Sequence, residues 1–561
     1  MNELLLVAIV LIPLAIYLHA GLTVHGSHDN PHVFFNAYRS ITAAEFAGSS
    51  VAYNFQVASI TFFIAFGFLI PIASIINAVL WAVGILLLKL ALPHLKEHFG
   101  SKDTLFSFLR RRYNSPLLQT IAAVVAMLGF IGLLLAELVW GSQIFAAFTA
   151  DPSVVYFTTF ALGIFILGYF MRGGHVSVVR TDQFQLLFSF IGFAAAFGWL
   201  FLSDFLQKTD VASAAIFVIS LTLALLYIAV VASIYRLEKQ EPTPGKLSLP
   251  KLLIYSVSIA SIGFIVLTVI NLSHIPSINQ IGGLFGTSSV DFSTISLISL
   301  LTLPIFWQFV DFSVWQRLGA VSPPESGTEE MHYNRIRRGI NRYALESPVT
   351  ILIASLFGIG CRLAATPFDE GTIWGALFTI PSIMLAGGFW QILAASLFAI
   401  AIVAVLLSTA DSSLVAASAI YIYDANPRTR NDLKADEIEE GIRSRLISAG
   451  IVIAGIIIGV GLVLYFVLRT LNVDIVAILF GAFGIQLALV PATVGAVFLR
   501  ARLPSRFWAV LSVLIGFAAG ISAMIHSYSN IEWQYLPPLA AISVAFIIYL
   551  VGMITQKIRS T

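Results

Sequence analysis

Long apolar segments alternate with short polar ones along the whole chain. A helix needs roughly 20 mainly apolar residues to cross a hydrocarbon core ~30 Å thick, because it rises ~1.5 Å per residue. About fifteen segments meet this requirement: 3–24, 45–66, 68–92, 117–146, 154–171, 183–203, 211–235, 252–273, 294–316, 347–366, 389–423, 442–468, 473–498, 507–527 and 534–555. The pattern therefore predicts an all-α, polytopic membrane protein with about 15 transmembrane helices.

The composition also indicates a lipid environment. Hydrophobic residues make up 58% of the 561 residues and charged residues only 11%, whereas soluble domains carry about 25% charged residues. The sequence has no Walker-type phosphate loop and no stretch long enough for a soluble catalytic domain. We therefore expect neither an enzyme nor an ATP-driven pump, and no nucleic-acid partner. The single cysteine, Cys361, excludes an internal disulfide bond.

The distribution of basic residues predicts the orientation in the membrane. With the N-terminus outside and fifteen spans threaded in turn, all but three of the 31 Lys and Arg residues lie on the cytoplasmic side or at its edge; the exceptions are Lys208, Arg362 and Arg469. Cytoplasmic loops of membrane proteins carry such an excess of Lys and Arg. We expect a protein integral to the plasma (inner) membrane, with its N-terminus outside and its C-terminus in the cytoplasm.

A dense run of polar residues, 408–413, interrupts the apolar span 389–423. Ser408 and Ser412 share one helix face, and Asp411 lies one residue round from it. Hydroxyl and carboxylate oxygens suit Na⁺, and polar groups inside a membrane span are functional by default. The alternative is that these hydroxyls only bond back to backbone carbonyls of the preceding turn. The density of the run favours a functional site.

Two further polar clusters lie near predicted span ends. In the stretch 173–185, which begins with two glycines in a predicted cytoplasmic loop, Asp182 and Gln185 are expected in the first turn of the next span. A capping role is the alternative there. In the stretch 45–55, small residues and Asn54 interrupt the apolar pattern. A helix broken at that point would expose backbone carbonyls that can bind a cation.

These motifs together resemble the sodium:solute symporter family, which includes sodium-coupled sugar, proline, pantothenate and sialic acid carriers. The resemblance rests on Gly173-Gly174 followed by Ser177-Val178 and Thr181-Asp182, and on the run Ser408 to Ser412. The stretch 110–116 and the sequence Trp315-Gln316-Arg317 are similar to the family as well. The similarity covers most of the chain.

The resemblance implies a leucine-transporter-like fold, in which two inverted five-helix repeats place substrate and cation between broken helices. It implies a sodium site made of Ala52, Phe55, Val405, Ser408 and Thr409. A further sodium position in some members implies Asp182 and Ser412 as ligands. Asp411 departs from the family pattern, because a hydroxyl often occupies its position.

The implied organisation is a single transporter domain, 1–561, with helices added to the repeats. It consists of a peripheral helix (3–24), a first repeat (45–203), an extra helix pair (211–273), a second repeat (294–498) and peripheral C-terminal helices (507–555). The extra pair departs from the usual family arrangement. Because two added helices preserve the inside–outside order, the inverted repeat survives the insertion.

Candidate substrate residues follow from the position of the second broken helix. Pro304 favours a break in the span 294–316, and this places Trp307 and Asp311 opposite Tyr53 and Asn54. Trp307 is a candidate for stacking on the substrate, and Asp311 for binding a cationic or hydroxylated group. Glu137 is another buried carboxylate in a predicted span. A structural role is an equal alternative for each carboxylate, and the sequence does not identify the substrate.

The sequence as a whole indicates a secondary active transporter, with Na⁺ as the coupling ion for symport of a small organic solute. Its expected partners are that solute, Na⁺ and the lipid bilayer. A proton-coupled carrier that uses Glu137 or Asp182 is one alternative. A transporter-like solute sensor that signals through a separate partner is another. The intact hydroxyl pair of Ser408 and Thr409 favours sodium over protons.

Overall fold

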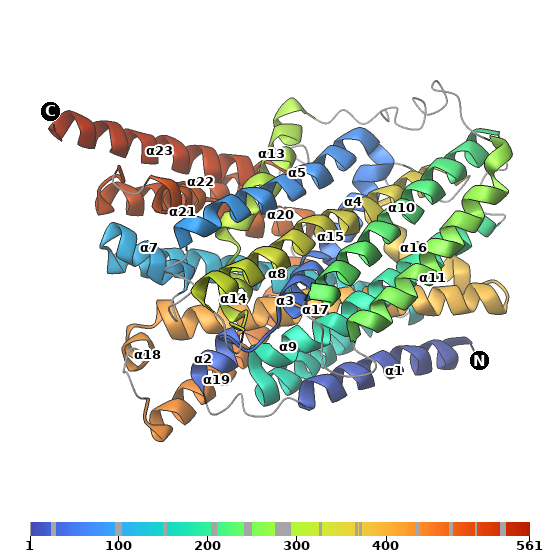
Figure 1. Ribbon diagram of the computed structural model, residues 1–561, viewed down its shortest axis with the longest axis horizontal. Helices are drawn as coiled ribbons and strands as arrows, with labels where there is room; N and C mark the ends of the chain where they lie inside the picture. The colour runs from blue at the N-terminus through green and yellow to red at the C-terminus, as the bar shows by residue number, and fades with distance from the viewer. Residues whose placement is uncertain are drawn as a thin grey trace.

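A computed structural model describes residues 2–23, 30–95, 104–149, 154–203, 210–240, 249–274, 293–324, 328–364, 369, 373–433, 438–470, 475–499, 502–527 and 534–560. These residues are almost entirely helical (Figure 1). Within these ranges there is no strand, and one isolated bridge pairs Ile41 with Val321. Most of the helices run roughly along the long axis of the molecule, and α1 begins at the opposite end from the end of α23 (Figure 1).

The longer helices are α1 (Asn2–Leu22), α3 (Ala43–Asn54), α4 (Val57–Leu69), α5 (Pro71–Ala91), α8 (Pro116–Thr149), α9 (Val154–Leu202), α10 (Asp210–Gln240), α11 (Leu249–Ile270), α13 (Thr294–Val310), α14 (Phe312–Ala320), α15 (Glu329–Leu363), α16 (Ala376–Leu385), α17 (Phe389–Ile420), α19 (Glu440–Thr470), α20 (Ile475–Leu487), α21 (Val490–Phe498), α22 (Arg506–Ser527) and α23 (Pro537–Ser560). Shorter helices are α2 (Pro31–Asn36), α7 (Leu105–Tyr113) and α18 (Pro427–Asp432).

Among the described residues, twelve helices are long and apolar enough to cross a membrane, or up to thirteen when the bent pair α3–α4 is taken as one span. The predicted number was about 15. The difference has two causes: α9 contains both predicted spans 154–171 and 183–203, and α1 contributes only the shorter apolar stretch Leu11–Leu22.

A kink at Gly174 joins the two halves of α9, where the sequence predicted a loop. Gly174 has φ 57° and ψ −145°, a conformation that only glycine adopts readily. The helix then resumes, so Asp182 lies about two turns beyond the kink. The expectation that Asp182 occupies the first helical turn is therefore wrong.

The first interrupted helix is the pair α3–α4, which bends by 62° between Asn54 and Val57. Thr42 caps the start of α3 in a capping box with Glu45, in which each side chain accepts a hydrogen bond from the other residue's backbone N–H. At its other end Phe55 leaves helical geometry, and Gln56 is extended before α4 begins. The break lies inside the protein, because Phe55 and Gln56 are both buried.

A second interruption separates α13 from α14 at Asp311, whose backbone is extended (φ −69°, ψ 94°). The helix passes through Pro304 and ends six residues later, at Val310. Asp311 then caps α14, since its side chain accepts a hydrogen bond from the Ser313 backbone N–H at 3.0 Å.

Two groups of helices pack against each other around these breaks. The helices α4, α5, α13 and α15 form one group, and α8, α9, α17 and α19 form the other. Helices α10 and α11, which correspond to the predicted extra pair, pack side by side and contact α15 and α9 (Figure 1). The interrupted helix α3 contacts α9, α15 and α17 and thus lies between the groups.

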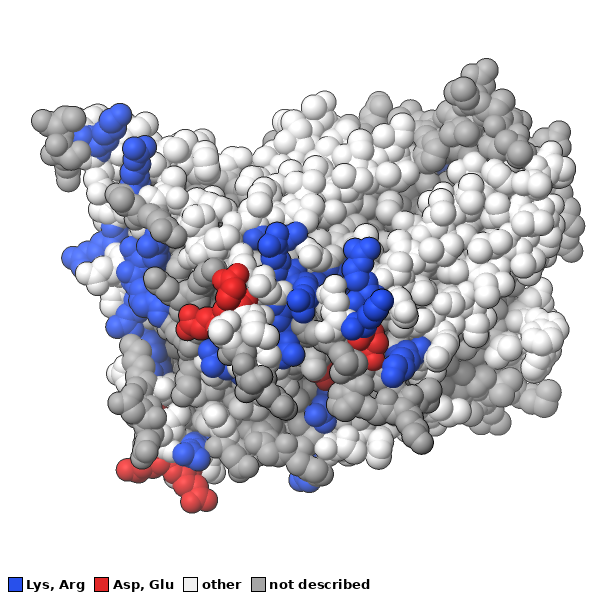
Figure 2. Space-filling view, in the orientation of Figure 1, with Lys and Arg blue, Asp and Glu red and all other residues white. Residues whose placement is uncertain are grey.

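Basic side chains are concentrated toward one end, as the sequence predicted. Figure 2 shows most of the visible Lys and Arg side chains in the left half and centre of the molecule, toward the end at which α23 finishes. Two of the arginines that the sequence predicts at the cytoplasmic side or its edge are buried within the protein. Arg317 is fully buried and Arg342 is 3% exposed.

Candidate functional site

The break between α3 and α4 lies against the middle of α17. The Thr409 hydroxyl donates a hydrogen bond to the backbone carbonyl of Tyr53 at 3.0 Å, and both residues are fully buried. Ala52 and Phe55 flank this carbonyl on the interrupted helix, and Val405 lies one helical turn before Thr409 on α17. The helices that carry the predicted sodium ligands therefore meet at the break.

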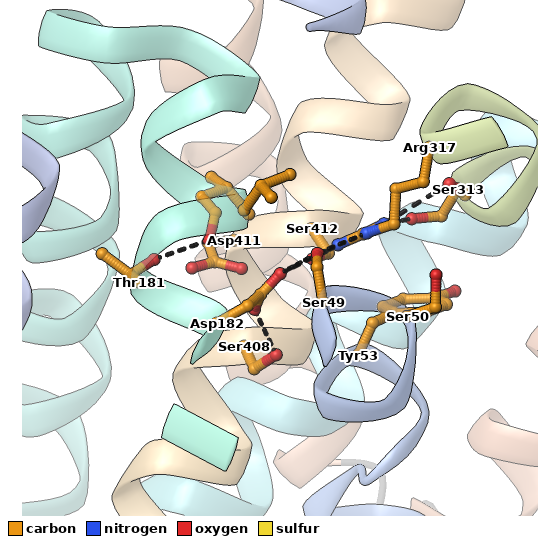
Figure 3. Close-up of polar contacts among 12 residues, drawn as sticks. Ser49, Ser50, Tyr53, Thr181, Asp182, Ser313, Arg317, Ser408, Asp411 and Ser412 are labelled. Atoms are coloured by element: carbon orange, nitrogen blue, oxygen red, sulfur yellow. Dashed lines mark hydrogen bonds and ion pairs between the residues drawn. The ribbon is translucent and has the colours of Figure 1, made fainter. Parts of the chain in front are cut away.

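Asp182 lies next to this crossing and accepts three hydrogen bonds from three different helices (Figure 3). The Ser408 hydroxyl donates to one carboxylate oxygen at 2.5 Å, and the Ser49 hydroxyl donates to the other at 2.5 Å. The Arg317 guanidinium completes the set at 3.1 Å. Asp182 is fully buried, so this arginine compensates a charge that would be very costly alone.

Arg317 is the centre of the network and was missed as a site residue by the sequence reasoning. Its Nε donates to the Ser49 hydroxyl at 2.6 Å, one Nη donates to Ser412 at 2.6 Å, and the other donates to Ser313. Its guanidinium also lies 5.2 Å from the centre of the Tyr53 ring, within the range of a cation–π interaction. Arg317 thus links α14 to α3, α9 and α17 at once (Figure 3).

Asp411 belongs to the same region of α17 but not to the contacts of Arg317. The Tyr169 hydroxyl donates a hydrogen bond to one of its carboxylate oxygens. In Figure 3 the Asp411 carboxylate lies on the side of Thr181, away from Arg317. Tyr169 on α9 thus satisfies one oxygen of the Asp411 carboxylate.

The candidate substrate residues of the two interrupted helices face each other. The Tyr53 hydroxyl lies 3.5 Å from Asp311, and the Trp307 indole N–H donates to the other Asp311 oxygen at 3.1 Å. The Trp307 ring packs edge-on against Phe483 with ring centres 4.6 Å apart. The Tyr53, Trp307 and Asp311 side chains are all fully buried, so the cluster is closed to solvent in this conformation.

A hydrogen-bonded chain of two amides and a phenol continues this cluster. Asn54 donates to the Tyr343 hydroxyl at 2.5 Å, and Tyr343 donates to the Gln308 carbonyl oxygen at 2.9 Å. Within the described residues, the Asn54 carbonyl oxygen and the Gln308 NH₂ group have no hydrogen-bond partner. Sequence reasoning missed Tyr343 and Gln308 as site residues. The site thus offers one acceptor and one donor group that no described residue uses.

Glu137 does not join these residues. Its carboxylate accepts hydrogen bonds from the backbone N–H groups of Val57 at 3.1 Å and Ala58 at 3.2 Å. These are the first two residues of α4, whose N–H groups have no partner within the helix. Glu137 therefore caps the half-helix that follows the break.

The oxygen-rich chemistry of this region suits a hard cation more than a transition metal. No group of three or more His, Cys, Asp and Glu side chains that could hold a metal ion occurs in the described part of the chain. Apart from the Arg317 guanidinium, the groups near the break are hydroxyls, carboxylates and backbone carbonyls, which are oxygen ligands that hard cations prefer.

No protein-family model matches the sequence, and no curated protein matches it. Among solved structures, the chain is similar to a Na⁺-coupled sialic acid symporter in its substrate-bound outward-open state, with a TM-score of 0.65 and 14% identity over 99% of this chain and 98% of that one. The nucleobase-cation-symport-1 family transporter Mhp1 aligns with a TM-score of 0.43 and 11% identity, over 94% of this chain and 95% of its own. A mutant manganese transporter from Eremococcus coleocola aligns with a TM-score of 0.42 and 13% identity, over 96% and 98%.

The first of these likenesses extends over both chains almost completely, and at this identity it establishes the fold alone. The predicted all-α, leucine-transporter-like membrane fold is confirmed.

Proposed function

We propose that this chain is a secondary active transporter that couples Na⁺ to the symport of a small organic solute by alternating access. The observation that carries the proposal is the crossing of α17 with the break of the first interrupted helix, where Thr409 donates to the Tyr53 carbonyl. A broken helix at membrane depth, with hydroxyls of a second helix against it, is the arrangement that transporters of this fold use for cations. The likeness to a Na⁺-coupled symporter supports the same function.

Na⁺ binds, in this proposal, to the hydroxyl oxygens of Ser408 and Thr409. Each hydroxyl already gives its hydrogen to another oxygen, Ser408 to Asp182 and Thr409 to Tyr53. The lone pairs of both oxygens therefore remain to face a cation. The backbone carbonyls that complete the proposed site are those of Ala52, Phe55 and Val405.

The predicted second sodium position, at Asp182 and Ser412, coincides with the contacts of Arg317. Arg317 donates to both residues, at 3.1 Å and 2.6 Å. A guanidinium and Na⁺ repel each other and need the same oxygen atoms. We propose that the two cations exclude each other here, so that the conformation with Arg317 in place carries one Na⁺.

The solute binds, in this proposal, between the two interrupted helices, in contact with Tyr53, Asn54, Trp307 and Asp311. The unused amide groups of Asn54 and Gln308 suit a polar solute that carries both a donor and an acceptor. Since Asp311 already accepts from Trp307 and the Ser313 backbone, a solute group near it must be a donor or a cation. A simple anion fits this site poorly.

The orientation follows from the charge distribution. We place the basic end in the cytoplasm and the start of α1 outside, in the plasma (inner) membrane, by the positive-inside rule. In that orientation, residues before α3 and after α14 meet on the cytoplasmic side. The Ile41 N–H donates to the Ala320 carbonyl at 3.2 Å, and the Ser322 N–H donates to the Ile41 carbonyl at 2.8 Å. Opening toward the cytoplasm then requires these contacts to separate.

The test is the thermal stability of the purified protein in Na⁺ and in K⁺ at equal ionic strength. A ligand that binds only the folded state stabilises it by about 2.7 kcal/mol at a hundredfold excess over Kd. We expect Na⁺ to raise the melting temperature of the wild type, and the pair Ser408→Ala and Thr409→Ala to abolish that rise. A panel of polar solutes added to the Na⁺ sample identifies a solute that enlarges the rise.

The matched control is Ser396→Ala with Ser418→Ala. Both hydroxyls are buried on α17 and bond only to carbonyls four residues earlier, each at 2.8 Å. We expect this variant to retain the Na⁺ response. A Na⁺ response that persists in the Ser408/Thr409 variant would refute the site, and a solute that binds without Na⁺-driven flux in proteoliposomes would indicate a sensor.

A proton-coupled carrier is the second candidate, and the observation that favours it is Glu137. This buried carboxylate bonds to two backbone N–H groups, and no ion pair to a basic side chain involves it among the described residues. Proton coupling predicts no Na⁺ effect and a solute-induced stabilisation that changes with pH.

A further inference from the structure

A basic cleft lies between the last turns of α10 and the first half of α15. Its volume is about 500 Å³, and its polar lining comprises Ser233, Arg236, Gln240, Arg338, Asn341 and Arg342. Three of these six residues are arginines. The cleft lies outside the proposed transport site and is formed by one helix of the extra pair.

The charge of the cleft is positive. Arg236 and Arg338 are exposed, whereas Arg342 is buried and pairs with Glu346 at 2.8 Å. Of the described residues that line the cleft, none is acidic. The nearest acidic neighbour on α10, Glu238, lies 4.0 Å from Lys251. The cleft thus brings together the guanidinium groups of Arg236 and Arg338, a donor arrangement that suits an anion with several oxygen atoms.

Apolar side chains next to the cleft distinguish a lipid from a soluble anion. Leu345, which lines the cleft, is 43% exposed, and Ile228 and Leu225 on α10 are 44% and 58% exposed. All three lie in helices long and apolar enough to span the membrane. An acyl chain covers such a surface, whereas a free phosphate leaves it bare.

We propose that this cleft binds the phosphate headgroup of an anionic phospholipid, with Arg236 and Arg338 as its ligands and the acyl chains along the exposed face of α10. Basic pockets between transmembrane helices at the cytoplasmic side have the chemistry for such headgroups. Arg342, in the wall of the cleft, also donates to the backbone carbonyl of Ala44 at 3.2 Å. The lipid site therefore touches the first turn of the interrupted helix α3.

The test is native mass spectrometry of the detergent-purified protein without Na⁺ or solute, so that it does not depend on the proposed transport. Phosphatidylglycerol and phosphatidylcholine with identical acyl chains are compared, and inorganic phosphate is added in a third sample. We expect tighter binding of phosphatidylglycerol by the wild type. We expect the double variant Arg236→Gln with Arg338→Gln to weaken this preference about 30-fold. This is the change in affinity expected when two basic residues that each contribute to the binding of an anionic lipid are lost.

The matched control changes the neighbouring basic residues of the same two helices, Lys239→Gln with Arg337→Gln. Both are exposed and neither lines the cleft. We expect the control to keep the preference for phosphatidylglycerol. Equal binding of the two lipids by the wild type, or equal losses in the two variants, overturns the proposal. Displacement of phosphatidylglycerol by millimolar inorganic phosphate overturns the choice of a lipid and indicates a soluble anion.

Discussion

Arg317 and Asp182 form an ion pair of 3.1 Å in which both side chains are fully buried. The two residues are 135 positions apart in the chain and lie on α14 and α9. Each is held by hydroxyls as well: Ser49 contacts both of them. Because α14 follows the second break and α9 packs with α8 and α17, the ion pair connects the second interrupted helix to that group of helices.

This arrangement predicts strong coupling between the two charges. Asp182→Asn or Arg317→Gln alone leaves the other charge buried without its partner, which typically costs about 3–5 kcal/mol. The double variant removes both charges, so we expect it to be more stable than the sum of the single changes predicts. Thermal or denaturant unfolding of the four proteins in K⁺ measures the coupling.

A control for this cycle is Asp182→Asn combined with Arg342→Gln. Arg342 pairs with Glu346 and does not contact Asp182. We expect the two effects to add. If the destabilising effects of Asp182→Asn and Arg317→Gln also add in their double variant, the two charges are not coupled and the ion pair does not stabilise the protein.

The kink in α9 predicts a position-specific effect of alanine. A Cβ on Gly174 would lie 2.2 Å from the backbone oxygen of Phe34, and the positive φ of 57° adds strain. We expect Gly174→Ala to destabilise the protein by at least about 1–3 kcal/mol. On the same helix, a Cβ added to Gly198 would have no neighbouring atom within 4 Å. We therefore expect Gly198→Ala to leave the stability of the protein unchanged or to raise it by up to about 1 kcal/mol. Equal melting temperatures for the two variants would contradict the kink.

Much of the fold is predictable from this sequence because lipid restricts the choices. A chain in the bilayer must satisfy its backbone hydrogen bonds within helices, so apolar segment length alone locates most spans. The first break was also predictable, because the small and polar residues before Asn54 interrupt an apolar run. The kink at Gly174 was not: a glycine pair at a span end is typical of a loop, and its close contact with Phe34 depends on tertiary packing.

The candidate site was predictable only in part. The hydroxyls of Ser408 and Thr409 stand out because they interrupt an apolar helix. Arg317 lies three residues before the end of α14, and a basic residue near a span end normally indicates the cytoplasmic surface. Tyr343 lies in an arginine-rich stretch whose composition is typical of a surface segment. In the structure this stretch is part of the continuous helix α15. Both residues belong to the site through contacts with distant helices, which a single sequence does not reveal.

The contacts of Glu137 predict a capping role. Glu137→Gln keeps one carbonyl oxygen but replaces the other acceptor with an NH₂ group, so one of the two N–H groups at the start of α4 loses its partner and we expect a loss of about 1–3 kcal/mol in the absence of solute. The Na⁺-induced rise in melting temperature should remain. Glu45→Gln, which alters the capping box of α3, serves as the matched control. A normal stability for Glu137→Gln together with a lost solute response would instead place Glu137 in the solute site.

Tyr343 connects the two interrupted helices through its hydroxyl, which accepts from Asn54 and donates to Gln308. Tyr343→Phe removes this link and leaves the Gln308 carbonyl oxygen without its partner, at about 1–3 kcal/mol, whereas the Asn54 NH₂ group keeps only its bond to the Ser50 carbonyl at 2.9 Å. We expect a weaker solute response, because the two amides no longer hold their positions, and an unchanged response to Na⁺. The measurement is the solute-induced shift in melting temperature in saturating Na⁺.

Tyr227→Phe controls for the loss of a buried hydroxyl elsewhere. Tyr227 is also fully buried, and its hydroxyl donates to the Phe190 carbonyl at 3.0 Å. It lies on α10, outside both interrupted helices, so we expect a small loss of stability and a normal solute response. If the two variants respond to solute alike, Tyr343 has only a structural role. If Tyr343→Phe alone loses the response, the solute binds where the two interrupted helices face each other.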